Sequence, residues 1–587
     1  MIEEDVVLEF PGSDRASTGA PEPFDGLRRG SEPELDLSFA ARSTHEGDDS
    51  IAKFSTVRRT LLEWPRRIGV GLDRWTRSLW QLPVLSGAAL ALAYVWVPFP
   101  ILNFVCFIPM LLWIEVNAYR PRGERLQAGF LFGMTAGLIS LHWMYSMLAF
   151  SWLAALLYVV LVSAFAAFAM VGATLAGWLR QRTGWSFSLL LPLSWIPLEW
   201  SRTWGDLRMT ADHVGNSLAA YPFLIQFADL VGPYGVGAFM LATNGLAYEA
   251  SRGWRTGSGR RAAAILIALW GAILAYDSWA WARPLEQRRP LRVAFVQPNI
   301  PLVMKWDPAA EEEQWKILEG MTREAAKAGA DVVFWPETAR PSTFYHVLER
   351  PDTYVMADVQ QLARDTGTGI VVGSEYDVLS GGKEKKYYNA AFSVHATGRL
   401  DPIWTAKTYL VPFVEGVPFK SLLGPLLAGK QGEMRWLGGG FTPGPTATPL
   451  PIVDTKVGLL VCYEELYWDL ARSLRNAGAG LEAIITNDAW FGRTFFQRYQ
   501  ADSARMRAIE NRCAFVRVAN TGISGFVDPW GRYHARTGLF EKRVGVEDIL
   551  VTSSLTVYDR IGDLMAWLAI AGLVVAVLTA RRSERWR

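Results

Sequence analysis

Three residues of the chain have the side-chain chemistry that acyl transfer through a thioester requires. They are Glu337, Lys407 and Cys462, and they occur in that order within one stretch of the sequence. A cysteine attacks as its thiolate, so it needs a base, and a carboxylate in an apolar pocket can serve when its pKa is raised toward neutrality. A fixed ammonium stabilises the oxyanion that forms when a carbonyl is attacked. The set therefore predicts covalent acyl transfer.

Each of these residues, taken alone, has an ordinary structural interpretation. A glutamate after Trp-Pro is typical of a turn or a cap, and a single lysine in a loop is typical of a solvated surface. A free cysteine often packs as a small hydrophobic residue. A disulfide between Cys462 and Cys513 is also open, and it would leave no free thiol at Cys462. The occurrence of all three types in one domain favours the catalytic interpretation.

The elements that must position these residues are short apolar segments. "DVVFWPET" reaches Glu337, "GLLVCYEE" reaches Cys462, and "WTAKTYLVPFVEGVPF" presents Lys407 with Glu415 further on. Reactive groups of α/β folds collect where strands end. Apolar segments alternate with helical ones between residues 290 and 550, which predicts an α/β or mixed layered domain.

The rest of the chain has the composition of a membrane protein. No Asp, Glu, Lys or Arg occurs from Ser78 to Ile114 or from Leu126 to Leu179. A membrane helix needs about 20 apolar residues, so each run holds two spans. Further candidates bring the predicted number to eight, of which the fifth and sixth are the weakest; these candidates are 186–201, 234–250, 261–282 and 561–580.

The charges of the loops predict how these spans are oriented. Lys and Arg gather in "YRPRGER", "RQR", "SRGWRTGSGRR" and "RRSERWR", and loops on the cytoplasmic side are enriched in these residues. The predicted organisation is an acidic, disordered and then basic tail over 1–77, seven spans over 78–285, and an extracytoplasmic domain over 290–555. The eighth span at 561–580 and a basic cytoplasmic tail over 581–587 follow.

Composition also argues against other functions. The net charge of +2 gives no indication of nucleic-acid binding, and three cysteines are too few for a disulfide framework. Cys106 lies in an apolar run, so we expect it to face lipid or to be packed, and we expect Cys513 in the core. None of the histidines in the 290–550 domain has a recognisable catalytic motif around it.

Three segments resemble the signatures of the nitrilase superfamily: "FWPET", "AKTYLVPFVEGVPF" and "GLLVCYEELYWD". With the membrane spans, the chain resembles the apolipoprotein N-acyltransferase family of bacterial lipoprotein maturation over roughly residues 80–580. The resemblance implies a polytopic α-helical membrane domain of about eight transmembrane helices plus an extracytoplasmic nitrilase-like αββα sandwich. It places the protein in the bacterial inner membrane.

The resemblance also implies roles for the three central residues. Glu337 would be the general base, Lys407 the oxyanion stabiliser and Cys462 the nucleophile. Glu415 matches a second family glutamate and would position the lysine and assist proton transfer.

Three further residues match family positions. Tyr463 and Glu464 match the pair that follows the family cysteine, and either a catalytic role or orientation of the turn fits them. Trp306 in "MKWDP" resembles a substrate-binding tryptophan on a mobile arm near the lipid entrance. "NDAWFG" (Asn487 to Gly492) resembles a segment near the site, and "SLLGPLLAG" (Ser421 to Gly429) is a candidate pocket wall or lid.

The implied reaction is a ping-pong transfer from a phospholipid, through a Cys462 thioester, to the N-terminal α-amine of a diacylglyceryl-modified apolipoprotein. It needs membrane lipid but no metal and no organic cofactor, and we expect a monomer.

Two rivals remain. A membrane-tethered amidase would share the three residues, although a tether needs only one span. A non-enzymatic membrane scaffold would be expected to have lost at least one of the three.

Overall fold

The structure is a computed structural model of the full chain. The residues that it describes are 79–95, 100–149, 153–255, 257–284, 290–347, 356–380, 384–412, 414–416, 419, 440–444 and 448–584. The predicted N-terminal tail (1–77), the 421–429 segment and the last three residues of the basic tail lie outside these ranges.

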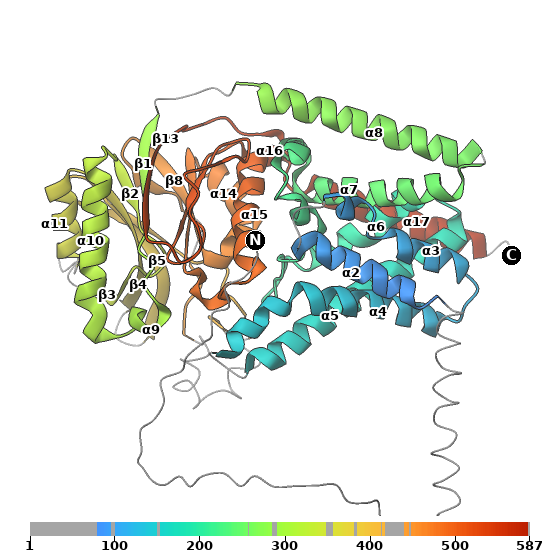
Figure 1. The fold of residues 1–587 in the computed structure, drawn as a ribbon, viewed down its shortest axis with the longest axis horizontal. Coiled ribbons are helices and arrows are strands. Elements are labelled where there is room, and N and C mark those ends of the chain that lie inside the picture. The colour runs from blue at the N-terminus through green and yellow to red at the C-terminus, as the bar shows by residue number, and fades with distance from the viewer. Residues whose placement is uncertain are drawn as a thin grey trace, which may run out of the picture. The chain divides into compact units, whose positions relative to one another are not determined.

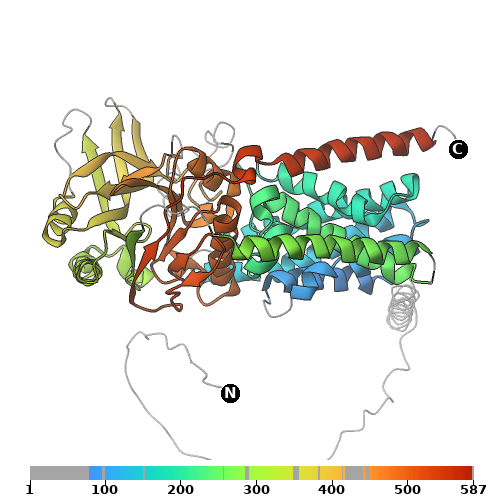
Figure 2. The same ribbon diagram turned by 90° about the horizontal axis from the view of Figure 1, so that it is seen from above.

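The first half of the described chain and its last long helix form a helical part. Its helices run roughly parallel to one another (Figures 1 and 2). They are α2 (Gln81–Val95), α3 (Ile108–Val116), α4 (Arg122–Ser140), α5 (Leu153–Thr183), α6 (Phe187–Ser201), α7 (Ala228–Arg252), α8 (Gly257–Ala282) and α17 (Leu564–Glu584). Short 3-10 helices join them: η1 (Pro100–Phe104), η2 (His142–Ala149), η3 (Val214–Leu218) and η4 (Pro222–Ile225).

Within the described ranges, 3 helices are long and apolar enough to cross a membrane, namely Ala154–Thr183, Gly257–Ala282 and Leu564–Ser583. Two apolar segments, Gln81–Val95 and Pro100–Val116, are shorter. A membrane-type helical part is therefore present, and the predicted number of eight spans stays a prediction. The fifth and sixth candidate spans, α6 and α7, are the weakest because each contains a local irregularity. α6 has only 15 residues with two internal prolines, and α7 is kinked at Gly232, where φ is 64°.

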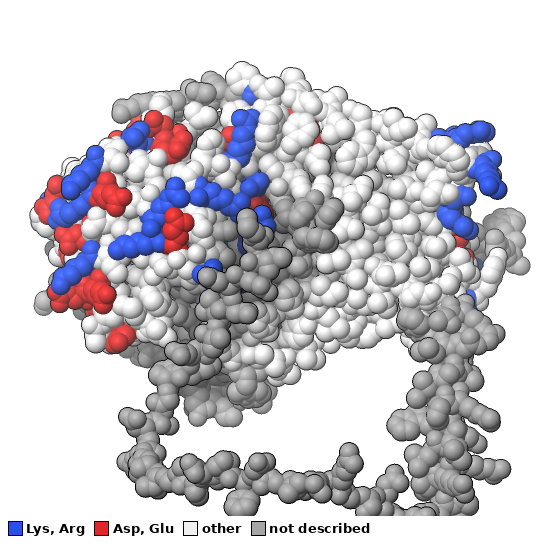
Figure 3. All heavy atoms as spheres, viewed as in Figure 1, with Lys and Arg blue, Asp and Glu red and all other residues white. Residues whose placement is uncertain are grey.

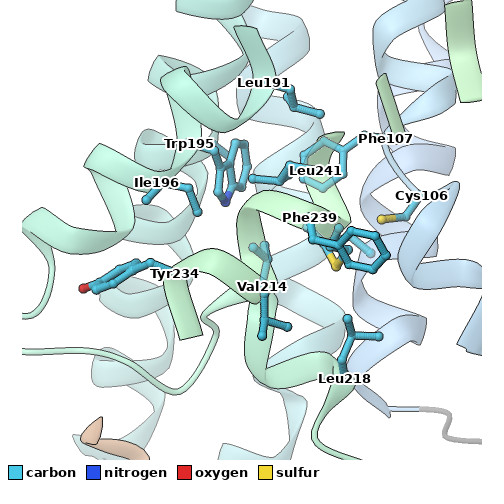
Figure 4. Packing of buried hydrophobic residues seen from close by; sticks show 14 of the residues in the cluster. Cys106, Phe107, Leu191, Trp195, Ile196, Val214, Leu218, Tyr234, Phe239 and Leu241 are labelled. Carbon is cyan, nitrogen blue, oxygen red and sulfur yellow. The ribbon is translucent and has the colours of Figure 1, made fainter. Parts of the chain in front are cut away.

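The helical part has a dense aromatic core (Figure 4). The Phe107 ring meets the edge of Trp195 at a centroid distance of 5.0 Å, a favourable geometry for aromatic pairs. Cys106 is fully buried in this cluster, so of the two expectations the packed one is correct.

Charge is distributed over the helical part as expected for membrane helices. Figure 3 shows an almost uncharged surface along the helices, with Lys and Arg gathered at one end. The last turn of α5 carries Arg180 and Arg182, and that of α17 carries Arg581 and Arg582. Basic residues at helix ends mark one side of a membrane.

The region after residue 290 folds as two stacked sheets. The first has 7 strands in the order β13-β1-β2-β4-β5-β6, with β3 paired to β4; the second has 6 in the order β12-β11-β10-β9-β8-β7. The first sheet consists of β1 (Leu291–Gln297), β2 (Val332–Phe334), β3 (Arg340–Val347), β4 (Gly369–Ser380), β5 (Glu384–Val394), β6 (Leu400–Ala406) and β13 (Arg543–Ile549). The second consists of β7 (Leu450–Ile452), β8 (Thr455–Val461), β9 (Leu481–Thr486), β10 (Phe515–Ala519), β11 (Gly525–Val527) and β12 (Tyr533–His534).

Helices cover both outer faces of the two sheets (Figure 1). On the first sheet lie α10 (Glu311–Lys327) and α11 (Ala357–Thr366), and on the second lie α14 (Trp468–Asn476) and α15 (Phe495–Asn511). Apolar residues from both sheets, such as Phe295 and Leu459, fill the layer between them. The predicted αββα sandwich is confirmed. The sequences of the central strands are continuous apolar runs because both faces of each sheet are buried.

Buried polar contacts join the sandwich to the helical part. Arg512, just after α15, places its Nε 2.9 Å from Asp229 Oδ2 and its Nη1 2.6 Å from Gln226 Oε1. Trp468 at the start of α14 packs its ring 4.8 Å from that of His213. Removing one partner of the buried Arg512–Asp229 pair would leave an uncompensated charge, which costs about 3–5 kcal/mol.

Candidate active site

Cys462 lies where β8 ends and the 3-10 helix η6 (Cys462–Leu466) begins. Its φ is 55°, in the left-handed region that non-glycine residues rarely adopt. Strained backbone of this kind concentrates at functional sites. The side chain is buried and the thiol is free, so no disulfide joins Cys462 to Cys513, which lies in the core as expected.

Glu337 lies just beyond β2, after the chain-turning Pro336. Its carboxylate is buried and held on both oxygens. Oε1 accepts a hydrogen bond from Asn389 Nδ2 at 2.7 Å, and Oε2 accepts one from the Asn487 backbone N–H at 2.9 Å. These two donors, from β5 and from the end of β9, fix the orientation of the carboxylate.

Lys407 follows β6 and is completely buried. Its Nζ lies 2.7 Å from Glu415 Oε1 and 3.9 Å from Glu337 Oε1. Burial by itself lowers the pKa of the Lys407 ammonium, but the charge of Glu415, the thiolate form of Cys462 and the charge of Glu337 outweigh it and raise that pKa above its ordinary value. Lys407 is therefore a permanent cation of the site.

The charges of the same groups act on the buried Cys462 thiol. Burial is the largest cause that raises the pKa of this thiol, and the Glu337 carboxylate raises it further, whereas the Lys407 ammonium lowers it. The pKa of the Cys462 thiol therefore lies well above its ordinary value, so the thiol is protonated at neutral pH. A protonated thiol needs a base before it can attack, and Glu337 is the carboxylate with the largest effect on this thiol; its role as the base stays a prediction.

Glu464 joins the segments that carry the nucleophile and the lysine. Its Oε1 accepts hydrogen bonds from the backbone N–H groups of Thr408 and Tyr409, at 2.6 and 2.9 Å, and its Oε2 accepts one from Val461 at 2.8 Å. Burial raises the pKa of the Glu464 carboxyl to about 7. This geometry favours a positioning role.

Tyr463 points toward the helical part. Its ring contacts Tyr467 at 5.3 Å and packs against the aromatic core of the helices. Either role expected for Tyr463 stays a prediction.

Trp306 directly follows the short helix α9 (Leu302–Lys305), and 45% of its surface is exposed. The preceding residue, Lys305, donates a hydrogen bond from Nζ to the Glu337 backbone carbonyl at 2.7 Å. The structure thus brings the Trp306 arm beside Glu337, and its substrate-binding role stays a prediction.

The "NDAWFG" segment also lies at the site. Its first residue, Asn487, binds Glu337, and η7 (Asp488–Phe491) follows. The Phe491 ring meets Trp143 of η2 at 5.3 Å, so this loop contacts the helical part.

Sequence reasoning missed a buried guanidinium behind the site. Arg517 in β10 donates from Nε and Nη2 to the two oxygens of Glu465, each at 3.0 Å, and from Nη1 to Asp488 Oδ2 at 3.1 Å. It thereby joins the turn after Cys462 to the "NDAWFG" loop. An arginine inside the apolar "CAFVRVA" segment was the available signal, because a charge in a buried strand requires a partner.

Lys305 and Asn389 were missed as well. Asn389 is a polar residue inside the apolar run "YYNAAFSV", which was a usable signal; Lys305 had none, because its burial depends on tertiary packing. Within the described ranges, no group of three or more His, Cys, Asp or Glu side chains could hold a metal ion.

Comparisons with known proteins give the same two parts. The family described as apolipoprotein N-acyltransferase N-terminal domain matches residues 86–246, and carbon-nitrogen hydrolase matches residues 292–553. The chain is similar to the apolipoprotein N-acyltransferase of Geobacter metallireducens, with 32% identity and coverage of 87% of this chain and 97% of that protein. It is also similar to that of Caulobacter vibrioides, with 33% identity and coverage of 86% and 96%.

We predict that Glu464→Gln flattens the pH dependence of thermal stability. Because the folded-state pKa of Glu464 is raised, its stabilising contribution is present below its ordinary pKa and is lost as the pH rises through about 7. One pKa unit corresponds to about 1.4 kcal/mol, so a contribution on the order of 3 kcal/mol is involved. Melting midpoints in detergent from pH 5 to 8 measure it.

The matched control is Glu313→Gln on the exposed face of α10, which should follow the parent protein. An equal fall of the melting midpoint in the parent protein and in Glu464→Gln would contradict the assignment.

Proposed function

This chain belongs to the apolipoprotein N-acyltransferase family, and on that basis we propose that it transfers a fatty acyl chain from a phospholipid to apolipoproteins. The acceptor is the α-amine of their N-terminal diacylglyceryl-cysteine, and the product is a triacylated lipoprotein. We propose that the chain is carried as a thioester on Cys462. The observation that carries this assignment is the buried ion-pair cluster of Glu337, Lys407 and Glu415, whose charges act on that thiol.

In the first half-reaction, Glu337 takes the proton of the Cys462 thiol as the sulfur attacks the ester carbonyl of a phospholipid. The oxyanion that forms is stabilised by the Lys407 ammonium, which Glu415 holds in place at 2.7 Å. When the tetrahedral intermediate collapses, the C–O bond breaks and the leaving alkoxide takes the proton from Glu337. The products are lysophospholipid and the thioester.

In the second half-reaction, the free α-amine of the diacylglyceryl-cysteine attacks the thioester. An α-amine has a pKa of about 8, so an appreciable fraction is neutral and nucleophilic near pH 7. Glu337 accepts a proton from the amine, and the C–S bond breaks. The proton then returns to sulfur, which regenerates the resting thiol and leaves an amide.

Transfer rather than hydrolysis requires that water be kept from the thioester. The burial of Cys462, Glu337 and Lys407 supports this, since each is less than a tenth exposed. Two loops of the site also contact the helical part: Trp143 packs on the "NDAWFG" loop, and the Arg208 guanidinium lies 4.0 Å from the centre of the Tyr409 ring. A site at this junction is reached by substrates that are anchored in lipid.

For the membrane arrangement, we propose eight spans in the bacterial inner membrane, with the sandwich on the extracytoplasmic side and a monomeric protein. The short helices α2, α3 and α6 would be three of these spans. Basic residues in the last turns of α5 and α17 support a common cytoplasmic side for these ends.

The thioester is tested by intact-mass spectrometry of the full chain purified with bacterial phospholipid. We expect an added mass of one fatty acyl chain that hydroxylamine removes and that is absent from Cys462→Ala. The adduct should be discharged by a synthetic diacylated lipopeptide. Absence of any adduct, with turnover of small amides instead, would favour a membrane-tethered amidase.

The topology is tested with two introduced cysteines in intact cells and a membrane-impermeant maleimide. Asp454→Cys lies in the exposed turn between β7 and β8, and Gly257→Cys lies at the exposed start of α8. We expect the maleimide, applied from outside the cell, to label Asp454→Cys and not Gly257→Cys. Labelling at Gly257→Cys alone would reverse the proposed orientation.

A further inference from the structure

A second lysine, Lys305, is buried beside the catalytic groups, and neither its sequence context nor the proposed mechanism gives it a role. It is the last residue of α9 and is 3% exposed. Its neighbours on the same arm are open to solvent: Val303 is 85% exposed and Trp306 is 45% exposed. Only the lysine of this arm enters the protein, and burying an ammonium is costly unless it is matched by negative charge.

The Lys305 ammonium lies 5.9 Å from the centre of the neighbouring Trp306 ring, and its charged and hydrogen-bonding partners lie on the side of the catalytic centre. Its Nζ donates to the Glu337 backbone carbonyl at 2.7 Å, and it interacts electrostatically with Glu337, Glu375 and Cys462. Glu375 is itself buried in β4 and accepts a hydrogen bond from the Tyr387 hydroxyl. An ammonium has three N–H groups, and the others of Lys305 have no protein acceptor among the described residues.

The charges of the site indicate what a second cation at the position of Lys305 would do. Glu337 and Glu415 both approach Lys407, so one ammonium faces two carboxylates. When the proton of the Cys462 thiol moves to Glu337, the total charge of the site stays the same, but the negative charge moves from the carboxylate to the sulfur. Burial disfavours a negative charge on this sulfur. A second cation nearby lowers the free energy of the thiolate, because opposite charges in a buried site interact strongly.

We propose that Lys305 is a positioning residue of the acyl-transfer site, which holds the Glu337 turn in place and supplies the second positive charge that makes ionisation of Cys462 possible. This inference rests on the proposed function and deepens it. The proton moves from Cys462 to Glu337, and Lys305 keeps its own.

The charge of Lys305 depends on pH. Burial lowers the pKa of its ammonium to about 8, against the raising effect of Glu337, Glu375 and Cys462. The charge is therefore present at neutral pH and is lost as the pH rises through about 8. An arginine at this position stays charged over the whole range.

The test is the rate at which iodoacetamide alkylates Cys462 in the purified full chain between pH 5.5 and 10, followed by peptide mass spectrometry so that each cysteine is read separately. We expect Lys305→Met to alkylate about tenfold more slowly at pH 7, with its profile moved to higher pH, since one pKa unit is a tenfold change in thiolate. Lys305→Arg should stay within about twofold of the parent protein at pH 7 and react faster at pH 9.

Two variants control for a merely structural effect. Val303→Ala perturbs the same short helix without its charge, and Lys316→Met removes an exposed charge from α10, where the side chain is 69% exposed. Both should follow the parent profile. An unshifted profile in Lys305→Met, or the same shift in Val303→Ala, would overturn the proposal.

If Lys305→Met does not fold, the proposal is tested by comparing the alkylation rate of Cys462 in Lys305→Arg with that in the parent protein at pH 9. Equal rates at this pH would contradict the proposal. Alkylation needs neither phospholipid nor lipoprotein. Failure of the proposed acyl transfer and failure of this role for Lys305 therefore give different results.

Discussion

The structure depends on keeping several charges together in a place from which water is largely excluded. Glu337 and Glu415 both lie within ion-pair distance of Lys407, and the thiol on which their charges act is buried as well. Such groups are unfavourable in a protein interior unless each has a partner, and removing one leaves the others uncompensated. Most of the surrounding polar contacts serve this requirement: Asn389 and Asn487 fix one carboxylate, and Glu464 fixes the segment that carries the lysine. The site is therefore built from many segments at once.

This constraint explains why the fold is a sandwich attached to helices. The chemical groups follow the ends of β2, β6 and β8, which belong to two different sheets, so stacking the sheets is what brings them together. The opening between these strand ends then has to be covered. Loops that contact the helical part provide this cover, and buried pairs such as Arg512 with Asp229 hold the two parts in register.

The sandwich and most of its central strands could be predicted from the sequence, because continuous apolar runs are a local property. Motif spacing singled out Glu337, Lys407 and Cys462, and their catalytic roles stay a prediction. The edge strands β6, β7, β12 and β13, together with β3 and β11, were not predicted, since they are short or mixed in polarity and depend on pairing with a neighbour. Lys305 and Arg517 could not be assigned partners from sequence, because their counter-charges lie on distant segments. The number of membrane spans is likewise open where helices are shortened by proline or kinked, as in α6 and α7.

The central claim is that a charge-balanced, water-poor site preserves a thioester until an amine arrives. The most direct measurement isolates the acyl-enzyme and follows its discharge in ¹⁸O-labelled water, with and without a diacylated lipopeptide. We predict that the lipopeptide amine discharges it at least about 100-fold faster than water, with little labelled fatty acid formed. Rapid release of labelled fatty acid at the same rate in both conditions would contradict the account, because it would show a hydrolase with an open site.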